Sequence, residues 1–223
     1  MSRSCIVVLA KAPLAGYAKT RLIPALGPHG AARLADQLLS HAVSQAAGAG
    51  ADAVVLCAAP DRHHLAFQRL QQQQNVQLSE QGSGDLGARM HRAFQQAFVL
   101  HGRVLLMGTD APALSSSVLR AALQRLEAPP SHPASSTERG CEAIDAVFVP
   151  ALDGGYALVG LRRECPALFH DMPWSTPQVM ALTRQRAREA GLRFTELPAV
   201  ADIDEPQDLV HLPAGWTGCE ASS

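Results

Sequence analysis

Apolar runs typical of strands alternate with longer helix-like segments through residue 126, and this alternation limits the fold more than any other feature of the chain. The strand-like runs are residues 6–10, 53–59, 75–78 and 103–107. The helix-like segments are residues 30–47, 62–74, 86–100 and 115–126, and the clearest, 86–100, repeats apolar residues at i, i+3 and i+4. Apolar strands separated by helices indicate a mainly parallel sheet covered on both faces, so we predict an α/β fold.

The pattern changes after residue 127. Residues 128–143 are rich in Pro and Ser and have no periodicity, which predicts an exposed mobile loop. The elements expected after it are strands at 147–150 and 156–160 around an Asp-Gly-Gly turn, a helix at 177–190, a strand at 193–197 and a turn or helix at 206–212. We expect one domain over residues 1–212 and a frayed tail over 213–223.

Composition excludes several classes of protein. The chain of 223 residues is 47% hydrophobic, which favours a packed core, and its 19 basic and 20 acidic residues leave no basic surface for nucleic acid. No apolar run approaches the ~20 residues that span a bilayer, and residues 6–10 are too few for a signal peptide. The five cysteines form no C-x-x-C pair, so neither a zinc site nor a disulfide framework is indicated. We expect a cytoplasmic protein.

The loop after the first strand is the first candidate site. Residues 11–21 carry three cations, Lys11, Lys19 and Arg21, and contain Gly and Pro. Such a loop at a strand's carboxyl end can direct backbone N–H groups and cationic side chains toward phosphate oxygens. It matches neither G-x-x-x-x-G-K-S/T nor G-x-G-x-x-G. The alternative is an ordinary solvated basic loop.

Asp110 is the second candidate. It follows the very apolar strand 103–107 in a tight turn that ends at Pro112, a position suited to a Mg²⁺ or Mn²⁺ ligand that faces phosphates. The alternative is that Asp110 only caps the following helix. Residues 115–117, all Ser, offer another cap for that helix.

Asp202 and Asp204 form the third candidate. Side chains two residues apart in an extended segment point the same way, so both carboxylates can share one cation. The alternative for Asp204 is a helix cap, since Pro206 suits a first helical turn.

Two glycine-containing segments give weaker signals. Asp153 precedes two glycines that allow a ligand to approach the backbone closely, or that simply form the hairpin. Gly82, Asp85 and Arg89 lie in a glycine-rich stretch before a helix, which suits either an anion or base site or a plain connector.

These segments together resemble, in order, the motifs of the bacterial DUF2064 family, within the GT-A glycosyltransferase and nucleotidyltransferase superfamily. The matching segments are residues 8–22, 82–90, 108–114, 150–156, 173–176 and 202–209. The stretch 19–22 also resembles that of phospholactate guanylyltransferases. The sequence departs from the family pattern at Ala111, where many relatives have Cys, and a metal held by oxygen ligands does not need that thiol.

The resemblance implies a GT-A-like three-layer α/β/α sandwich with a nucleotide site. By the resemblance, Lys11, Lys19 and Arg21 contact the phosphates of the nucleotide, and Asp110 binds the metal. Either Asp204 or Asp202 is then a second metal ligand, with Asp204 preferred.

The function expected from the resemblance is a nucleotide-diphospho-sugar transferase that uses Mg²⁺ or Mn²⁺ and a small-molecule acceptor. Asp110 and Asp204 hold the metal, Lys19 and Arg21 neutralise the phosphates, and Asp153 orients or deprotonates the acceptor. Two alternatives stand beside it. One is a nucleotidyltransferase that makes a nucleoside-diphosphate-activated metabolite from a nucleoside triphosphate, and the other is a non-catalytic nucleotide-binding protein.

Overall fold

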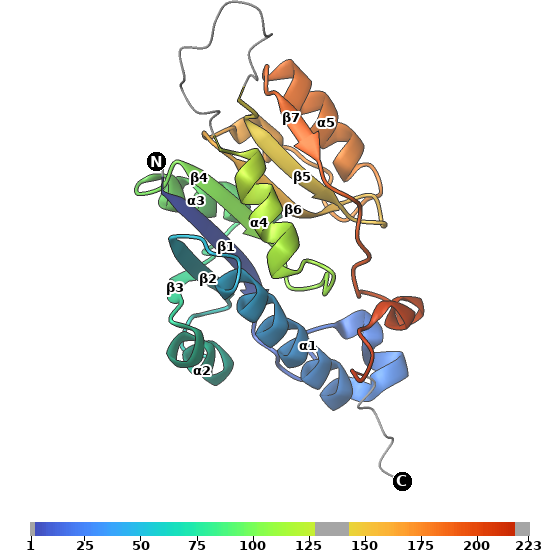
Figure 1. Ribbon diagram of the computed structural model, residues 1–223. Coiled ribbons are helices and arrows are strands. Elements are labelled where there is room, and N and C mark those ends of the chain that lie inside the picture. Colours follow the sequence, from blue (N-terminus) through green and yellow to red (C-terminus); the bar gives the residue numbers. More distant parts are fainter. Residues whose placement is uncertain (1–2, 128–142, 217–223) are drawn as a thin grey trace, which may run out of the picture.

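The computed structural model describes residues 3–127 and 143–216, in which one seven-stranded sheet lies between two layers of helices (Figure 1). The strands are β1 (Ser4–Lys11), β2 (Ala53–Ala59), β3 (Gln77–Glu80), β4 (Arg103–Met107), β5 (Ala146–Pro150), β6 (Tyr156–Leu161) and β7 (Phe194–Glu196). Their order across the sheet is β3-β2-β1-β4-β6-β5-β7.

All strands except β6 run in the same direction. β1 pairs in parallel with β2 and β4, β2 with β3, and β5 with β7, whereas β6 is antiparallel to both β4 and β5. The predicted hairpin around Asp153 is therefore confirmed. Because β1, β4 and β5 are parallel, the loops that follow them emerge at one edge of the sheet, where ligands bind in folds of this kind.

Helices cover both faces of the sheet. They are α1 (Ile23–Ala47), α2 (Leu65–Gln74), α3 (Leu86–Phe98), α4 (Ser116–Arg125) and α5 (Val179–Glu189), with 3₁₀ helices η1 (Thr20–Leu22), η2 (Pro166–Leu168) and η3 (Pro206–His211). Side chains alternate along β1, so Ile6 and Val8 pack with α1, α2 and α4, while Cys5 and Val7 pack with α3 and α5. In Figure 1, α1 and α4 lie in front of the sheet and α3 behind it.

The starts of α1 and α2 differ most from those that periodicity predicts. The helical segment α1 starts at Ile23 and is kinked at Gly27, whose φ of 67° is left-handed, just before Pro28. Periodicity starts only beyond this kink, at residue 30, so the first turns were missed. α2 starts at Leu65 rather than at residue 62, because His64 is its N-cap and accepts a hydrogen bond from the Ala66 N–H.

The predicted loop at 128–143 lies, except for its last residue, outside the described residues, as do residues 217–223 of the predicted tail. Within residues 3–127 and 143–216, no helix combines the length and the apolar character needed to cross a membrane.

Candidate functional site

A cavity of about 660 Å³ opens at the carboxyl edge of the sheet. Its walls come from the end of β1 and the loop after it, the loop after β4, the β5–β6 turn, the loop before α5 and the segment after β7. It is therefore the place where the loops predicted to carry chemistry meet.

Backbone hydrogen bonds bring the C-terminal segment to this edge. The Val200 N–H donates to the Pro150 carbonyl at 3.0 Å, and the Ile203 N–H donates to the Asp110 carbonyl at 2.8 Å. The Ile203 side chain is fully buried among residues of η1 and α1, including Leu22 and Leu34. Figure 1 shows this segment in red beside the blue start of α1. The two residues that flank Ile203, Asp202 and Asp204, are consequently held beside Asp110.

Lys19 joins these segments. Its backbone is left-handed, with φ 50° and ψ 44°, and its side chain is only 8% exposed. The ammonium Nζ lies 2.5 Å from Asp110 Oδ1, 2.9 Å from Asp204 Oδ1 and 2.5 Å from the Ile203 carbonyl oxygen. An ammonium has three donors, so these three acceptors satisfy it.

The charges of this cluster stabilise one another. Burial by itself would lower the pKa of Lys19, but attraction to and hydrogen bonds with Asp110 and Asp204 outweigh burial, so the pKa is raised above its ordinary value. Lys19 is therefore a cation at neutral pH. The side chains of Asp110 and Asp204 both line the cavity and remain 45% and 42% exposed, which leaves them accessible to a ligand.

Asp202 and Asp153 form the acidic side of the same cavity. Burial, reinforced by repulsion from Asp153, Asp204 and Asp208, raises the pKa of Asp202 to about 6. Asp153 accepts a hydrogen bond from the Gly155 N–H at 2.8 Å within the β5–β6 turn. These carboxylates favour a cationic or proton-donating partner in the cavity.

The capping alternatives for the acidic residues do not apply. Ser115 is the N-cap of α4 and its Oγ accepts from the Val118 N–H, so Asp110 does not cap that helix. Glu205 is the N-cap of η3, and the Asp208 carboxylate accepts from the N–H groups of Glu205 and Asp204. The Asp204 side chain instead contacts Lys19.

The remaining predicted cations also reach this cavity. Lys11 at the end of β1 and Arg21 in η1 line it, and Arg21 is 62% exposed with its guanidinium 3.9 Å from Glu205. Both side chains are accessible to an anion that enters the cavity.

Gly82, Asp85 and Arg89 do not line this cavity. Asp85 caps α3 by accepting from the Ala88 N–H at 2.8 Å, and Arg89 donates to the Gly84 carbonyl at 2.9 Å. Asp85 lines a separate hollow of about 480 Å³. The role of these three residues at a nucleotide stays a prediction.

Gln81, Tyr156 and Trp174 also line the cavity, and sequence reasoning assigned no individual role to any of them, although the segments that contain them were singled out. Gln81 is buried and donates to two strand carbonyls, so its position depends on neighbouring strands that the sequence does not juxtapose. Tyr156 and Trp174 meet edge to face, with ring centroids 6.4 Å apart. Tyr156 belongs to the family segment 150–156 and Trp174 to the family segment 173–176, so the resemblance was the available signal for both.

The donor set fits a divalent metal whose coordination a substrate completes. Among residues 3–127 and 143–216, no group of three His, Cys, Asp or Glu side chains is arranged to hold a metal ion. Mg²⁺ commonly binds one or two carboxylates together with substrate phosphates rather than an all-protein cage. Asp110 and Asp204 already converge on one positive centre, so they fit a two-carboxylate site of this kind.

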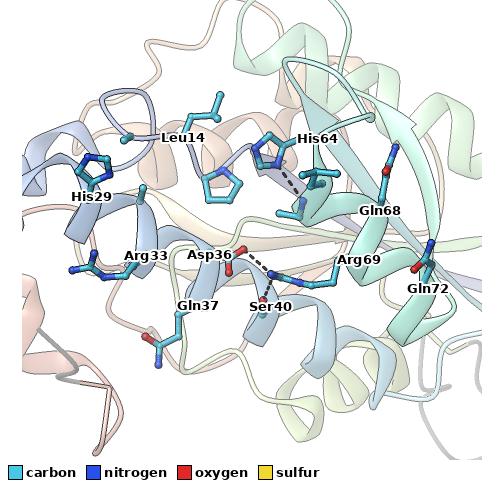
Figure 2. A pocket seen from close by; sticks show the side chains of 15 residues that line it. Leu14, His29, Arg33, Asp36, Gln37, Ser40, His64, Gln68, Arg69 and Gln72 are labelled. Atoms are coloured by element: carbon cyan, nitrogen blue, oxygen red, sulfur yellow. Dashed lines mark hydrogen bonds and ion pairs between the residues drawn. The ribbon is translucent and has the colours of Figure 1, made fainter.

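A larger hollow of about 1150 Å³ lies between α1 and α2, and residues 13–15 of the loop after β1 also line it (Figure 2). The carboxylate in its wall, Asp36, is already paired, since Arg69 donates to Asp36 at 2.8 Å and to Ser40 at 3.2 Å. His64 in its wall caps α2. We therefore place the candidate site in the smaller cavity, where the carboxylates gather.

Comparisons with known proteins agree with this fold. The family model described as "Uncharacterized protein conserved in bacteria (DUF2064)" matches residues 40–176. A search of curated proteins gave no match. Among solved structures, a candidate nucleotide-diphospho-sugar transferase from Desulfovibrio desulfuricans G20 is 30% identical, with a TM-score of 0.80, over 99% of this chain and 90% of its own.

Two more distant structures share the fold. CMP:2-keto-3-deoxy-manno-octonic acid synthetase in complex with CTP is 12% identical, with a TM-score of 0.56, over 94% of this chain and 96% of its own. Glucosyl-3-phosphoglycerate synthase from Mycobacterium tuberculosis was solved in complex with Mn²⁺, UDP and glucosyl-3-phosphoglycerate. It is 10% identical, with a TM-score of 0.54, over 94% of this chain and 75% of its own. The predicted GT-A-like α/β fold is confirmed. Since the family model covers more than half of the chain, the chain belongs to the DUF2064 family.

Proposed function

We propose that this chain is a metal-dependent transferase whose donor is a nucleotide-diphospho-sugar. The observation that carries the proposal is the cluster of Lys19, Asp110 and Asp204 at the carboxyl edge of the sheet, with Lys11 and Arg21 on the same cavity. Carboxylates and cations together are what a metal-bound diphosphate requires. The similarity to the Desulfovibrio protein supports the choice of a sugar donor.

In this proposal the carboxylates hold the metal that binds the diphosphate, and the cations contact the phosphate oxygens directly. Asp110 and Asp204, with Asp202 beside them, would hold Mg²⁺ or Mn²⁺, which when bound supplies electrostatic stabilisation of the leaving diphosphate. Lys11 and Arg21 bind phosphate oxygens from the β1 side, Arg21 with a planar fork and Lys11 as a point charge.

Asp153 is the proposed base. An acceptor hydroxyl oxygen bonds to the anomeric carbon of the donor, the bond from that carbon to the phosphate oxygen breaks, and the hydroxyl proton passes to Asp153. The Gly155 N–H, which donates to Asp153 Oδ1, fixes the orientation of this carboxylate. The nucleoside diphosphate leaves with the electron pair of the broken bond.

Two relatives support a nucleotide and a metal as ligands. The glucosyl-3-phosphoglycerate synthase structure contains UDP and Mn²⁺, and the octonic acid synthetase structure contains CTP. At 10% and 12% identity these proteins share only the fold with this chain, so base, sugar and acceptor are matters for experiment.

The proposal is tested by binding followed by product analysis. Thermal unfolding is measured with a panel of nucleoside diphosphates and nucleotide sugars, each with Mg²⁺, Mn²⁺ or a chelator. A true ligand at ~100 times its dissociation constant should add about 2.7 kcal/mol of stability. Turnover of the stabilising nucleotide sugar should then release the nucleoside diphosphate.

Other products would contradict a sugar transferase. Pyrophosphate released from a nucleoside triphosphate and a phosphorylated acceptor, with nucleotide sugars left intact, would establish nucleotidyl transfer instead. Nucleotide binding without turnover across a broad acceptor screen would indicate a non-catalytic nucleotide-binding protein.

A further inference from the structure

We propose that the Lys19 ammonium and the divalent metal compete for the carboxylates of Asp110 and Asp204, so that metal binds tightly only when nucleotide phosphates draw Lys19 away. The inference rests on the proposed function, since it assumes a metal-bound nucleotide. It adds an order of events, in which the metal arrives with the nucleotide rather than before it.

The contacts of Lys19 define the competition. Nζ lies within 2.9 Å of one oxygen of each carboxylate, at the point where the two acidic side chains converge. A metal ion that used both carboxylates would sit close to this ammonium, and like charges at such a distance repel strongly in a partly buried site. The side chain of Lys19 is 8% exposed, so solvent does little to screen this repulsion.

The Lys19 side chain can move from the two carboxylates to a phosphate in the cavity. Its four-carbon stem is flexible, its residue lies on the wall of the cavity, and Lys11 and Arg21 mark the same wall as a place for phosphates. A buried charge is stable only when paired. Transfer of Lys19 to a phosphate, with the metal moving to the carboxylates, keeps every charge paired, whereas metal binding alone would leave the ammonium with only the neutral Ile203 carbonyl as a partner.

A purely structural clamp is the competing explanation. Lys19 also donates to the Ile203 carbonyl, 184 residues further along the chain, and so ties the loop after β1 to the C-terminal segment. If the clamp were the whole role, loss of the ammonium would lower stability and leave metal affinity unchanged or weaker. Competition predicts the opposite sign for metal affinity.

Metal affinity without nucleotide is therefore the discriminating quantity. Mn²⁺ is titrated calorimetrically into wild type, Lys19→Met and Lys19→Gln, the last of which keeps hydrogen-bond donors but not the charge. We expect both variants to bind Mn²⁺ about tenfold more tightly than wild type, and the nucleoside diphosphate to raise Mn²⁺ affinity less in the variants than in wild type. The charge-retaining Lys19→Arg should bind Mn²⁺ as weakly as wild type.

Arg69→Met is the matched control. It removes a cation that contacts a carboxylate at 2.8 Å, but in the hollow between α1 and α2 (Figure 2), and should leave Mn²⁺ affinity unchanged. Circular dichroism of each variant without metal establishes that it is folded.

Specific results would overturn the inference. Equal or weaker Mn²⁺ affinity in whichever of Lys19→Met and Lys19→Gln is folded would make Lys19 a clamp only. Failure of every protein to bind Mn²⁺ would also refute the competition. Neither result depends on turnover of a nucleotide sugar, so failure of the proposed function is detected separately by the product assay.

Discussion

Asp110→Asn tests the metal site with little disturbance of the fold. The amide has almost the shape of the carboxylate and its oxygen can still accept a hydrogen bond from Lys19, so only the charge is lost. Lys19 keeps Asp204 and the Ile203 carbonyl as partners. Because the Asp110 side chain is 45% exposed, we expect the free energy of unfolding to fall by about 1 kcal/mol or less.

The effect of Asp110→Asn on metal-dependent nucleotide binding should be far larger. An amide replaces one of the two carboxylates proposed to hold the metal. Loss of a residue that binds the metal directly should lower metal affinity by more than the 10–100-fold typical of residues that only position a ligand. We expect the affinity for a nucleoside diphosphate with Mn²⁺ to fall at least about 100-fold, or roughly 2.7 kcal/mol. Affinity measured with a chelator present should barely change.

The assay is isothermal titration of wild type and Asp110→Asn with the nucleoside diphosphate, once with Mn²⁺ and once with the chelator. A variant that is folded and retains the wild-type difference between the two titrations would exclude Asp110 from the metal site.

Four further predictions follow from the same geometry. Arg21→Ala should weaken binding of a nucleoside diphosphate by about 1.5–3 kcal/mol and leave nucleoside affinity nearly unchanged, whereas equal losses in the two titrations would exclude a phosphate contact. Asp204→Ala should weaken Mn²⁺ binding with nucleotide more than Asp202→Ala does, and calorimetry that gave the reverse order would transfer the metal role to Asp202. The pKa of Asp202 is raised from 3.8 to about 6, so between these pH values the folded chain holds more protons than the unfolded chain, and stability falls as pH rises. Asp202→Asn should therefore raise the melting temperature at pH 7 but not at pH 4. An unchanged melting temperature at pH 7 would contradict this prediction. Gly87→Ala should lower the free energy of unfolding by about 1–3 kcal/mol, because a Cβ there would lie 2.2 Å from the Phe169 carbonyl oxygen, and an unchanged denaturation midpoint would show that the segment at 169 can move.

Periodicity and apolar runs predicted most of the fold. Strands 53–59 and 103–107 have the predicted bounds, since they are buried runs between clear breaks. The start of α1 was missed because the left-handed Gly27 and then Pro28 interrupt the apolar repeat. Such local backbone geometry is not encoded in hydrophobic spacing.

The site was predictable in its residues more than in its contacts. The positions of Asp110, Asp202 and Asp204 after strands placed them at one edge, and the structure brings them together. The contact between Lys19 and Asp204 spans 185 residues and depends on the path of the chain after β7, which no local pattern specifies. The Asp85 carboxylate caps its own helix, and its predicted role at a nucleotide stays a prediction.

The most direct test of the metal site is the anomalous scattering of Mn²⁺ in crystals grown with Mn²⁺ and a nucleoside diphosphate. We expect an anomalous peak within coordination distance of carboxylate oxygens of both Asp110 and Asp204, with phosphate oxygens as further ligands and the Lys19 ammonium on a phosphate. A manganese ion bound elsewhere, or a nucleotide bound in the cavity with Lys19 still between the two carboxylates, would contradict this expectation.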